Sequence, residues 1–403
     1  MKLFKKFAAI TLCIALLLSL LACGKDTGSA DTDGEGGTES GSSANAIGYP
    51  ALIDCAETSG NIKNVILIIG DGMGEAHLDA GELFGGVEFA FRDELSKFYS
   101  ETNSLDKKGE ATEVTDSAAS ATAMATGHLT VNKSAGMDAK MNYLSTILDL
   151  AKEYNKSTGV ITTDYLTGAT PAGFTAHTNN RNLENKVIQS QIDCGVDLMI
   201  GQYYDLYNDY SEQISKNYGF FTEYDREGIL ADKTKDAFCH FEIETEAESS
   251  VKLSEVTDLA IEYLSADEDG FVLVVEQAHI DKHSHNKELE GSAKAAVSLN
   301  ETVSLALAYA KEVGNTAVIV TADHETCGLA VSTDPEELPK KAPTPSGAEF
   351  SYEYKAAYHT DTPVPVFVFG FVARPELCPT YKSAERIKNS EIFSFIQDLV
   401  VNS

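Results

Sequence analysis

Three apolar runs in the sequence are each followed by a carboxylate. The runs are Val65–Ile69, Phe271–Val275 and Ala317–Thr321, and the carboxylates are Asp71, Glu276 and Asp323. A single acidic residue in such a place is usually the N-cap of a helix. Three carboxylates at the carboxyl edge of one parallel sheet would repel one another unless a cation held them. The pattern therefore predicts a metal site at that edge.

Histidines extend the set of candidate ligands. Asp281 and His285 are four positions apart, so on a helix they would share one face and could bind one metal ion. On the same geometry His283 points elsewhere and is expected to be a spectator, and His279 is expected to pack or to lie at the surface.

Two further histidines lie beside strand candidates. His324 directly follows Asp323, and His359 precedes the apolar run Val364–Phe369. Nitrogen and carboxylate ligands together favour zinc, whereas carboxylates with a hydroxyl favour magnesium.

Ser117 is the candidate nucleophile. Asp116 before it is a natural N-cap, the residues after it are small, and Gly127 can end the helix. Ser117 would then lie at a helix N-terminus, where N–H groups and the helix dipole favour phosphate and a developing alkoxide. The same pattern is also ordinary capping chemistry, so it does not establish catalysis on its own.

Two more polar residues could complete such a site. Thr170 precedes Pro171, which favours an extended backbone at Thr170 and leaves its hydroxyl free to meet a metal. Arg181 could bind two phosphate oxygens with its planar guanidinium. An isolated arginine usually makes a surface ion pair, so the role of Arg181 depends on the wider pattern.

Short apolar runs alternate with helical patterns, which is typical of an α/β fold. The expected strands are Val65–Ile69, Gly159–Thr162, Phe271–Val275, Ala317–Thr321 and Val364–Phe369, and the expected helices are Ser117–Thr126, Tyr143–Tyr154, Ser254–Ser265 and Ser292–Val313. Two segments read as excursions from the core: acidic, aromatic Gln202–Ser250, and Val331–Ala357, which is rich in Pro, Lys and Glu.

The charge balance restricts the partners. The 403-residue chain has 62 acidic and 31 basic residues, a formal net charge of −31. Nucleic acid would be repelled over most of such a surface, so we expect no nucleic-acid binding. A phosphate substrate would need local positive charge from metals or an arginine.

The first residues resemble an export signal. Lysines precede a short apolar stretch, Phe7–Leu21, and the motif Leu-Leu-Ala-Cys ends at Cys23. The stretch is short for a membrane span, so we expect a lipoprotein signal at 1–23, a lipid on Cys23 and a cell-envelope location at the bacterial membrane. A flexible tether is expected at 24–58 and the catalytic domain at 59–403. Five cysteines remain, whose disulfide pairing the sequence does not decide: Cys55, Cys194, Cys239, Cys327 and Cys378.

Seven motifs together resemble the alkaline phosphatase family and occur in its order between about Asn64 and Gly370. They are Asp71-Gly-Met-Gly, Thr115-Asp-Ser-Ala-Ala-Ser, Ala169-Thr-Pro-Ala, Asn180-Arg, Glu276 with Asp281 to His285, Thr321-Ala-Asp-His-Glu, and His359-Thr. The resemblance implies a three-layer sandwich: a central, mostly parallel sheet flanked by helices, with small inserted segments, one of them crown-like near Val331–Ala357.

The resemblance also implies a role for each motif. Asp281, His285 and His359 match the ligands of one zinc; Asp71, Asp323 and His324 those of a second; and Asp71, Thr170 and Glu276 those of a third metal, usually magnesium. Ser117 matches the nucleophile, Arg181 the phosphate-binding arginine, Asp116 its orienting neighbour, and Lys282 a residue that could contact phosphate through water. The implied activity is hydrolysis of small phosphate monoesters, with broad specificity, through a phosphoserine that releases inorganic phosphate. The sequence leaves the oligomeric state open, with a homodimer as one alternative.

One position departs from the family pattern. Family members usually carry Asp or His two residues before the threonine ligand, and here Gly168 stands there. That residue helps to organise water around the third metal and pairs with the position of Lys282. Gly168 therefore leaves the third metal's identity open and predicts a weaker magnesium dependence than usual.

Three other classes of protein differ from a phosphomonoesterase in the residues they require. Sulfatases need a C/S-x-P-x-R context, whereas Ser117 is followed by Ala-Ala-Ser, so that activity is disfavoured. A metal-dependent phosphodiesterase of the same superfamily is the main alternative, although Arg181 favours a doubly charged terminal phosphate. A lipid-anchored solute-binding protein would need neither a nucleophile nor three metal sites.

Overall fold

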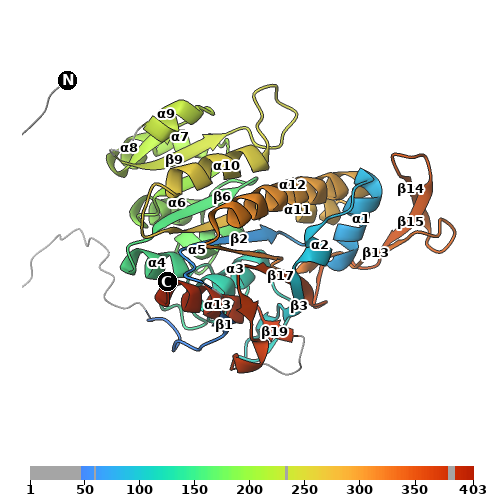
Figure 1. Ribbon diagram of the computed structural model, residues 1–403, viewed down its shortest axis with the longest axis horizontal. Coiled ribbons are helices and arrows are strands. Elements are labelled where there is room, and N and C mark those ends of the chain that lie inside the picture. Colours follow the sequence, from blue (N-terminus) through green and yellow to red (C-terminus); the bar gives the residue numbers. More distant parts are fainter. Residues whose placement is uncertain (1–46, 59, 232–234, 380–385) are drawn as a thin grey trace, which may run out of the picture. The chain divides into compact units, whose positions relative to one another are not determined.

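A computed structural model describes residues 47–58, 60–231, 235–379 and 386–403 (Figure 1). The expected signal segment, Cys23 and most of the expected tether lie outside these residues, so those predictions stay predictions. Among the helices of the described residues, none combines the length and apolar character needed to cross a membrane.

A ten-stranded sheet organises the described chain, in the order β19-β3-β17-β11-β2-β10-β6-β7-β9-β8. The bounds are β2 Asn64–Gly70, β3 Ser96–Glu101, β6 Ser157–Thr162, β7 Leu198–Gln202, β8 Tyr218–Phe221, β9 Asp236–Phe241, β10 Phe271–Gln277, β11 Thr316–Thr321, β17 Val364–Phe369 and β19 Arg386–Lys388. Neighbouring strands are parallel except around β17, which runs antiparallel to β11 and β3. The predicted α/β fold with a mostly parallel sheet is confirmed.

Helices cover both faces of the sheet (Figure 1). Their bounds are α1 Glu75–Gly85, α2 Phe91–Glu94, α3 Ser117–Thr126, α4 Ile147–Glu153, α5 Ala169–Thr175, α6 Glu184–Asp193, α7 Leu206–Asp209, α8 Ser211–Asn217, α9 Arg226–Ala231, α10 Leu253–Leu264, α11 His279–His285, α12 Leu289–Val313 and α13 Ser390–Val401, with a 3-10 turn at Pro375–Leu377. Val65, Leu67 and Ile69 of β2 share a core with α3, α4 and α13. Ile66 and Ile68 share another core with α1, α10 and α12. This alternation gives three layers.

The five predicted strands and four predicted helices are all present, with small shifts at their ends. β2, β10 and β11 are buried along their whole length, which explains why their sequences are almost continuously apolar. The Val331–Ala357 excursion is also found outside the main sheet, as three antiparallel strands: β13 Leu329–Ser332, β14 Lys340–Pro343 and β15 Glu349–Tyr354.

The interpretation of Gln202–Ser250 as an excursion is wrong. This segment supplies β8 and β9, which continue the main sheet in parallel beyond β7. Tyr218 and Phe238 are buried and pack edge to face, with ring centroids 6.1 Å apart. The prediction failed because these strands are short and aromatic, lie among acidic residues and contain no run of Val and Ile.

Three pairs of short strands complete the described elements. They are β1 Ala56–Glu57 with β18 Val372–Ala373, β4 Ser104–Leu105 with β5 Ala111–Glu113, and β12 Glu325–Thr326 with β16 His359–Thr360. The β12–β16 pair matters for the site, because it holds His359 beside the loop that follows β11.

Candidate metal centre and nucleophile

The three strand-end carboxylates converge because their strands are neighbours in register. Ile69 of β2 pairs with Thr321 of β11 on one side and with Glu276 of β10 on the other. The residues that follow these positions therefore leave the sheet at one edge, and Asp71 and Asp323 lie just beyond it. The convergence predicted from the sequence is present in the structure.

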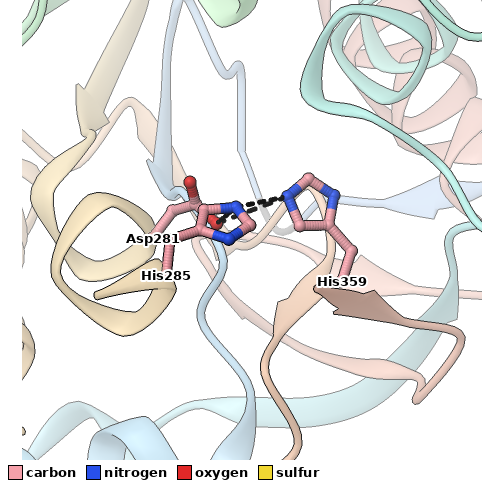
Figure 2. A group of neighbouring side chains, drawn as sticks. All are labelled: Asp281, His285 and His359. Atoms are coloured by element: carbon pink, nitrogen blue, oxygen red, sulfur yellow. Dashed lines mark hydrogen bonds and ion pairs between the residues drawn. The ribbon is translucent and has the colours of Figure 1, made fainter. Parts of the chain in front are cut away.

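Asp281, His285 and His359 form a first cluster, with ligand atoms within 4.8 Å of one another. Figure 2 shows the two rings facing each other beside the Asp281 carboxylate. His285 Nε2 lies 3.0 Å from His359 Nε2 and 3.3 Å from Asp281 Oδ1. His359 Nδ1 lies 2.9 Å from the Thr115 carbonyl, so a proton on Nδ1 leaves Nε2 free to face the cluster.

Asp71, Asp323 and His324 form a second cluster, buried and of the same size. His324 Nε2 lies 3.1 Å from Asp323 Oδ2 and 3.5 Å from Asp71 Oδ1. Both of these carboxylate oxygens are buried and make no hydrogen bond to another described residue. Buried oxygens without hydrogen bonds are costly, so the second cluster fits a cation.

The charges of the second cluster support the same conclusion. Burial first, and then the neighbouring carboxylates of Asp323, Asp281 and Glu276, raise the pKa of Asp71 well above its usual range. Burial acts to raise the pKa of Asp323. The charge and hydrogen bond of His324, together with the Gly72 N–H and His359, exceed this effect, and the pKa of Asp323 is lowered. A bound cation would reduce the electrostatic repulsion among the carboxylates of this site.

Asp71, Glu276 and Thr170 form a third group. The Thr170 hydroxyl is buried and has no hydrogen-bond partner among the described residues. Burial first, and then Asp164, raise the pKa of Glu276 to about 7. Carboxylates with a free hydroxyl are oxygen ligands that suit magnesium. The residues present therefore fit a third cation.

The expected extended backbone at Thr170 is wrong. Thr170 lies in the first turn of α5, followed by Pro171. Proline is tolerated there because the first N–H groups of a helix have no partner within the helix. The close packing of α5 on α3 fixes the site: a Cβ on Gly173 would lie 2.6 Å from the Ala121 Cβ.

Ser117 is the first residue of α3 and is buried. Asp116 caps the helix by accepting a hydrogen bond from Ala119 N at 3.0 Å, as predicted. The Ser117 Oγ lies 3.2 Å from His324 Nε2. One turn further on, the Ser120 hydroxyl donates to the Asp323 carbonyl at 2.6 Å, so the candidate nucleophile and the second cluster are held together by direct contacts.

Asp116 and Arg181 are linked through Lys133. Asp116 Oδ2 accepts from Lys133 N at 3.0 Å, and the Lys133 carbonyl accepts from Arg181 N at 2.8 Å. Within the described residues the two side chains form no ion pair with each other. The Arg181 charge opposes the rise in the pKa of Asp71, so the guanidinium lies near the second cluster.

Lys282 forms an ion pair with Asp164. His283 pairs with Glu288 at 2.8 Å, and His279 lies near its ring, so neither joins a cluster. Asp164 and Thr326 had no predicted role, although the Thr326 hydroxyl donates to Asp281 Oδ1. Asp164 precedes the motif residues by only a few positions, but an aspartate in a loop carries no signal of its own.

Known proteins are similar to much of this chain. The sequence profile described as Alkaline phosphatase matches residues 62–203 and 232–366. Alkaline phosphatase 3 of Bacillus subtilis is 29% identical over 299 residues, which span 68% of this chain and 63% of that protein. Alkaline phosphatase of Escherichia coli is 31% identical over 346 residues, which span 68% of this chain and 72% of that protein.

The structural likeness is broader. A variant of the alkaline phosphatase from the Antarctic bacterium TAB5, solved with Mg bound in its M3 site, aligns with a TM-score of 0.72 and 26% identity. The alignment covers 86% of this chain and 99% of that one. Members of this family are metal-dependent and act on phosphate monoesters, and the comparisons support phosphomonoesterase activity here. The chain belongs to the alkaline phosphatase family.

Proposed function

We propose that this chain is an alkaline phosphatase that hydrolyses phosphate monoesters through a covalent phosphoserine at Ser117. The contact of 3.2 Å between Ser117 Oγ and His324 Nε2 carries the proposal, because it places a hydroxyl against the cluster of Asp71, Asp323 and His324. A hydroxyl at a helix N-terminus beside a cation site can become an alkoxide at a moderate pH.

The donor sets support two zinc ions and one magnesium. The first zinc would be held by Asp281, His285 and His359, the second by Asp71, Asp323 and His324, and magnesium by Asp71, Thr170 and Glu276. When bound, such cations lower the pKa of an attacking hydroxyl or water and neutralise charge on the leaving oxygen.

The residues of the chain divide the reaction into two steps. Ser117 Oγ loses its proton and attacks phosphorus; the bond from phosphorus to the ester oxygen breaks, and the alcohol leaves after taking up a proton. Water then attacks the phosphoserine, which releases inorganic phosphate and restores the Ser117 hydroxyl. Arg181 binds two of the remaining phosphate oxygens, and Asp116 positions the backbone of Arg181 through Lys133.

We propose broad specificity for the alcohol part of the ester. The residues with a proposed role would contact the phosphate or the cations. None of them is proposed to contact the alcohol part of the ester. A phosphodiesterase stays the alternative, and Arg181 favours the monoester because a doubly charged phosphate offers it two terminal oxygens.

Export, lipidation and dimer formation also stay proposals. The apolar stretch Phe7–Leu21 and the position of Cys23 support a lipid anchor at the bacterial membrane, with a tether at 24–58 and the catalytic domain at 59–403. Labelling of cells with a radioactive fatty acid should mark the wild-type chain but not a Cys23→Ala variant. Sedimentation of the purified protein would show whether it is a dimer.

Hydrolysis of a chromogenic aryl phosphate tests the proposed function. Turnover at alkaline pH should vanish on chelation, return with zinc and be absent from Ser117→Ala, while the exposed-site variant Ser346→Ala keeps wild-type turnover. Metal-dependent cleavage of a diester without monoester turnover would move the activity to the phosphodiesterases. Inactivity toward both esters in the zinc-loaded protein would reject the enzyme.

A further inference from the structure

Gly168 is the position where the family usually carries an acidic residue or histidine, and a second side chain fills the space beside it. A Cβ built on Gly168 would lie 3.0 Å from Asp164 Oδ2 and 2.8 Å from the Tyr165 carbonyl. The backbone of Gly168 has φ −57° and ψ 163°, which any residue can adopt. The glycine is therefore explained by the Asp164 carboxylate and the turn behind it rather than by backbone conformation.

Asp164 is connected to the third group by a short chain of contacts. Asp164 N donates to Thr162 Oγ1 at 2.9 Å, and the Thr162 hydroxyl donates to Glu276 Oε2. Asp164 therefore belongs to the same hydrogen-bonded group as the Glu276 carboxylate, which is a candidate ligand of the third cation.

Asp164 also fixes Lys282. The two side chains form an ion pair, in which the Asp164 side chain is mostly buried and the Lys282 side chain is 46% exposed. The lysine ammonium lies 5.9 Å from the centre of the Tyr165 ring. An aspartate four residues upstream therefore makes the contact with Lys282 that the family pattern assigns to the residue at 168.

We propose that Asp164 replaces the side chain missing at Gly168: it adds the carboxylate that helps to hold the third cation, and it positions Lys282 beside that site. The proposal rests on the proposed function for the identity of the third site. It replaces the weaker magnesium dependence expected from Gly168 alone, because the negative charge is retained from another position. Asp164 is a positioning residue, since it acts through the cation and Lys282.

Calorimetric titration of magnesium into metal-stripped, zinc-reloaded protein tests this role without requiring turnover. Wild type should bind magnesium, and Asp164→Asn should bind it at least about tenfold more weakly, as loss of a supporting carboxylate does at other metal sites. Asp209→Asn, which removes an exposed aspartate in α7, should bind magnesium like wild type. The zinc content of both variants, measured by mass spectrometry of the metals, should match wild type.

Lys282→Met separates the two parts of the proposal. Removing the ammonium should leave magnesium affinity equal to or higher than in wild type, because Asp164 keeps its charge, and should raise KM for the monoester. Equal magnesium affinity in Asp164→Asn and wild type would overturn the proposal, as would weak binding by wild type itself. A failure of the proposed function would instead appear as missing turnover with magnesium affinity still dependent on Asp164.

A different observation carries a second inference, at the cysteines. Cys55 Sγ and Cys378 Sγ lie 2.6 Å apart, and both side chains are buried. Cys55 directly precedes β1, which pairs with β18, and Arg374 N donates to the Cys55 carbonyl at 2.8 Å. The pairing of two strands far apart in the sequence thus brings the two thiols together in a fixed arrangement.

We infer that Cys55 and Cys378 form a disulfide in the mature protein. The two thiols would lose two protons and two electrons to a disulfide oxidant, such as the disulfide form of a thiol oxidoreductase or of a small thiol, whose disulfide is reduced to two thiols. The bond would tie the start of the described chain to the segment before α13. Cys194, Cys239 and Cys327 would stay as thiols, since each lacks a sulfur partner among the described residues.

Peptide mapping of the unreduced protein, purified from an oxidising compartment, tests this bond. A Cys55 peptide should be joined to a Cys378 peptide, and reduction should separate them and lower the melting temperature. Cys55→Ser with Cys378→Ser should melt at the temperature of the reduced wild type, whereas Cys239→Ser should keep a melting temperature that depends on reduction. Recovery of both peptides as free thiols before reduction would contradict the inference.

Discussion

Ser117 Oγ and His324 Nε2 lie 3.2 Å apart, although 207 positions separate them in the sequence. The same nitrogen faces Asp323 and Asp71 at 3.1 and 3.5 Å. One ring nitrogen therefore joins the helix that carries the hydroxyl to the strand ends that carry the carboxylates. The contact exists because the small residues of α3 allow this helix to pack close to the sheet edge.

Arg181→Ala should weaken phosphate binding. The guanidinium charge acts on Asp71, and the substitution would remove the proposed bidentate contact between Arg181 and the phosphate. KM for an aryl phosphate should rise by about tenfold or more. Arg226→Ala, which breaks the ion pairs with Asp258 and Glu262 on the surface, should leave KM unchanged. Equal KM in Arg181→Ala and wild type would remove Arg181 from the binding site.

Metal-free protein should lose stability as pH rises. Burial, followed by Asp164, raises the folded-state pKa of Glu276 to about 7, above its ordinary value in an unfolded chain. Between about pH 4.5 and pH 7 the unfolded chain binds fewer protons than the folded one, so unfolding becomes easier as pH increases. The gap in melting temperature between zinc- and magnesium-loaded and metal-free protein should therefore widen as pH rises from about 4.5 to 7. A gap in melting temperature that is constant with pH would show that ionisation of Glu276 does not destabilise the metal-free protein.

Gly173→Ala should reduce both stability and turnover. The new Cβ would lie 2.6 Å from the Ala121 Cβ and 2.9 Å from the backbone of α3, so α3 and α5 must move apart. Overpacking of this kind costs about 1–3 kcal/mol, and it displaces the helices that carry Ser117 and Thr170. Gly48→Ala, where the added carbon meets nothing within 4 Å, is the control for thermal unfolding and kcat. Unchanged values for Gly173→Ala would contradict the close packing.

Asp236→Asn should stabilise the protein at neutral pH and above. Burial, and then the Asp197 carboxylate, raise the pKa of Asp236 to about 6. The folded state thus loses its proton at a higher pH than the unfolded chain, and wild type loses stability as pH rises from about 4 through 6. Asparagine removes this loss, which solvent screening limits to about 1 kcal/mol. Urea unfolding should show a gain at about pH 8 and none near pH 4; a gain at both values would point to another cause.

Most of the metal centre could be predicted because its ligands follow strands that are buried on both faces. Such strands are continuous apolar runs, as in β2, so the residues after them stand out. Asp281 and His285 could also be placed together, since the helical spacing alone puts them on one face. His359 is a candidate ligand from its place before a strand, but only the family resemblance places it with Asp281 and His285, because that grouping depends on the pairing of β12 with β16.

The remaining features depend on contacts between distant segments. β8 and β9 lack long apolar runs, and their place in the sheet follows from side-by-side pairing with β7. The role of Asp164 depends on the turn that brings its carboxylate against Gly168 and Lys282. The helical position of Thr170 overrides the local preference before proline, because the first turn of α5 packs on α3.

The most direct test of the central claim is to trap the covalent intermediate. Zinc-loaded protein would be mixed with a phosphate monoester, quenched in acid within the first turnovers, digested and mapped by mass spectrometry. If Ser117 is the nucleophile, the peptide that contains Ser117 should carry one phosphate, and no phosphate should be found in Ser117→Ala or in metal-free wild type. Steady turnover of the monoester with no phosphate at Ser117 at any quench time, or phosphate on another residue, would contradict it.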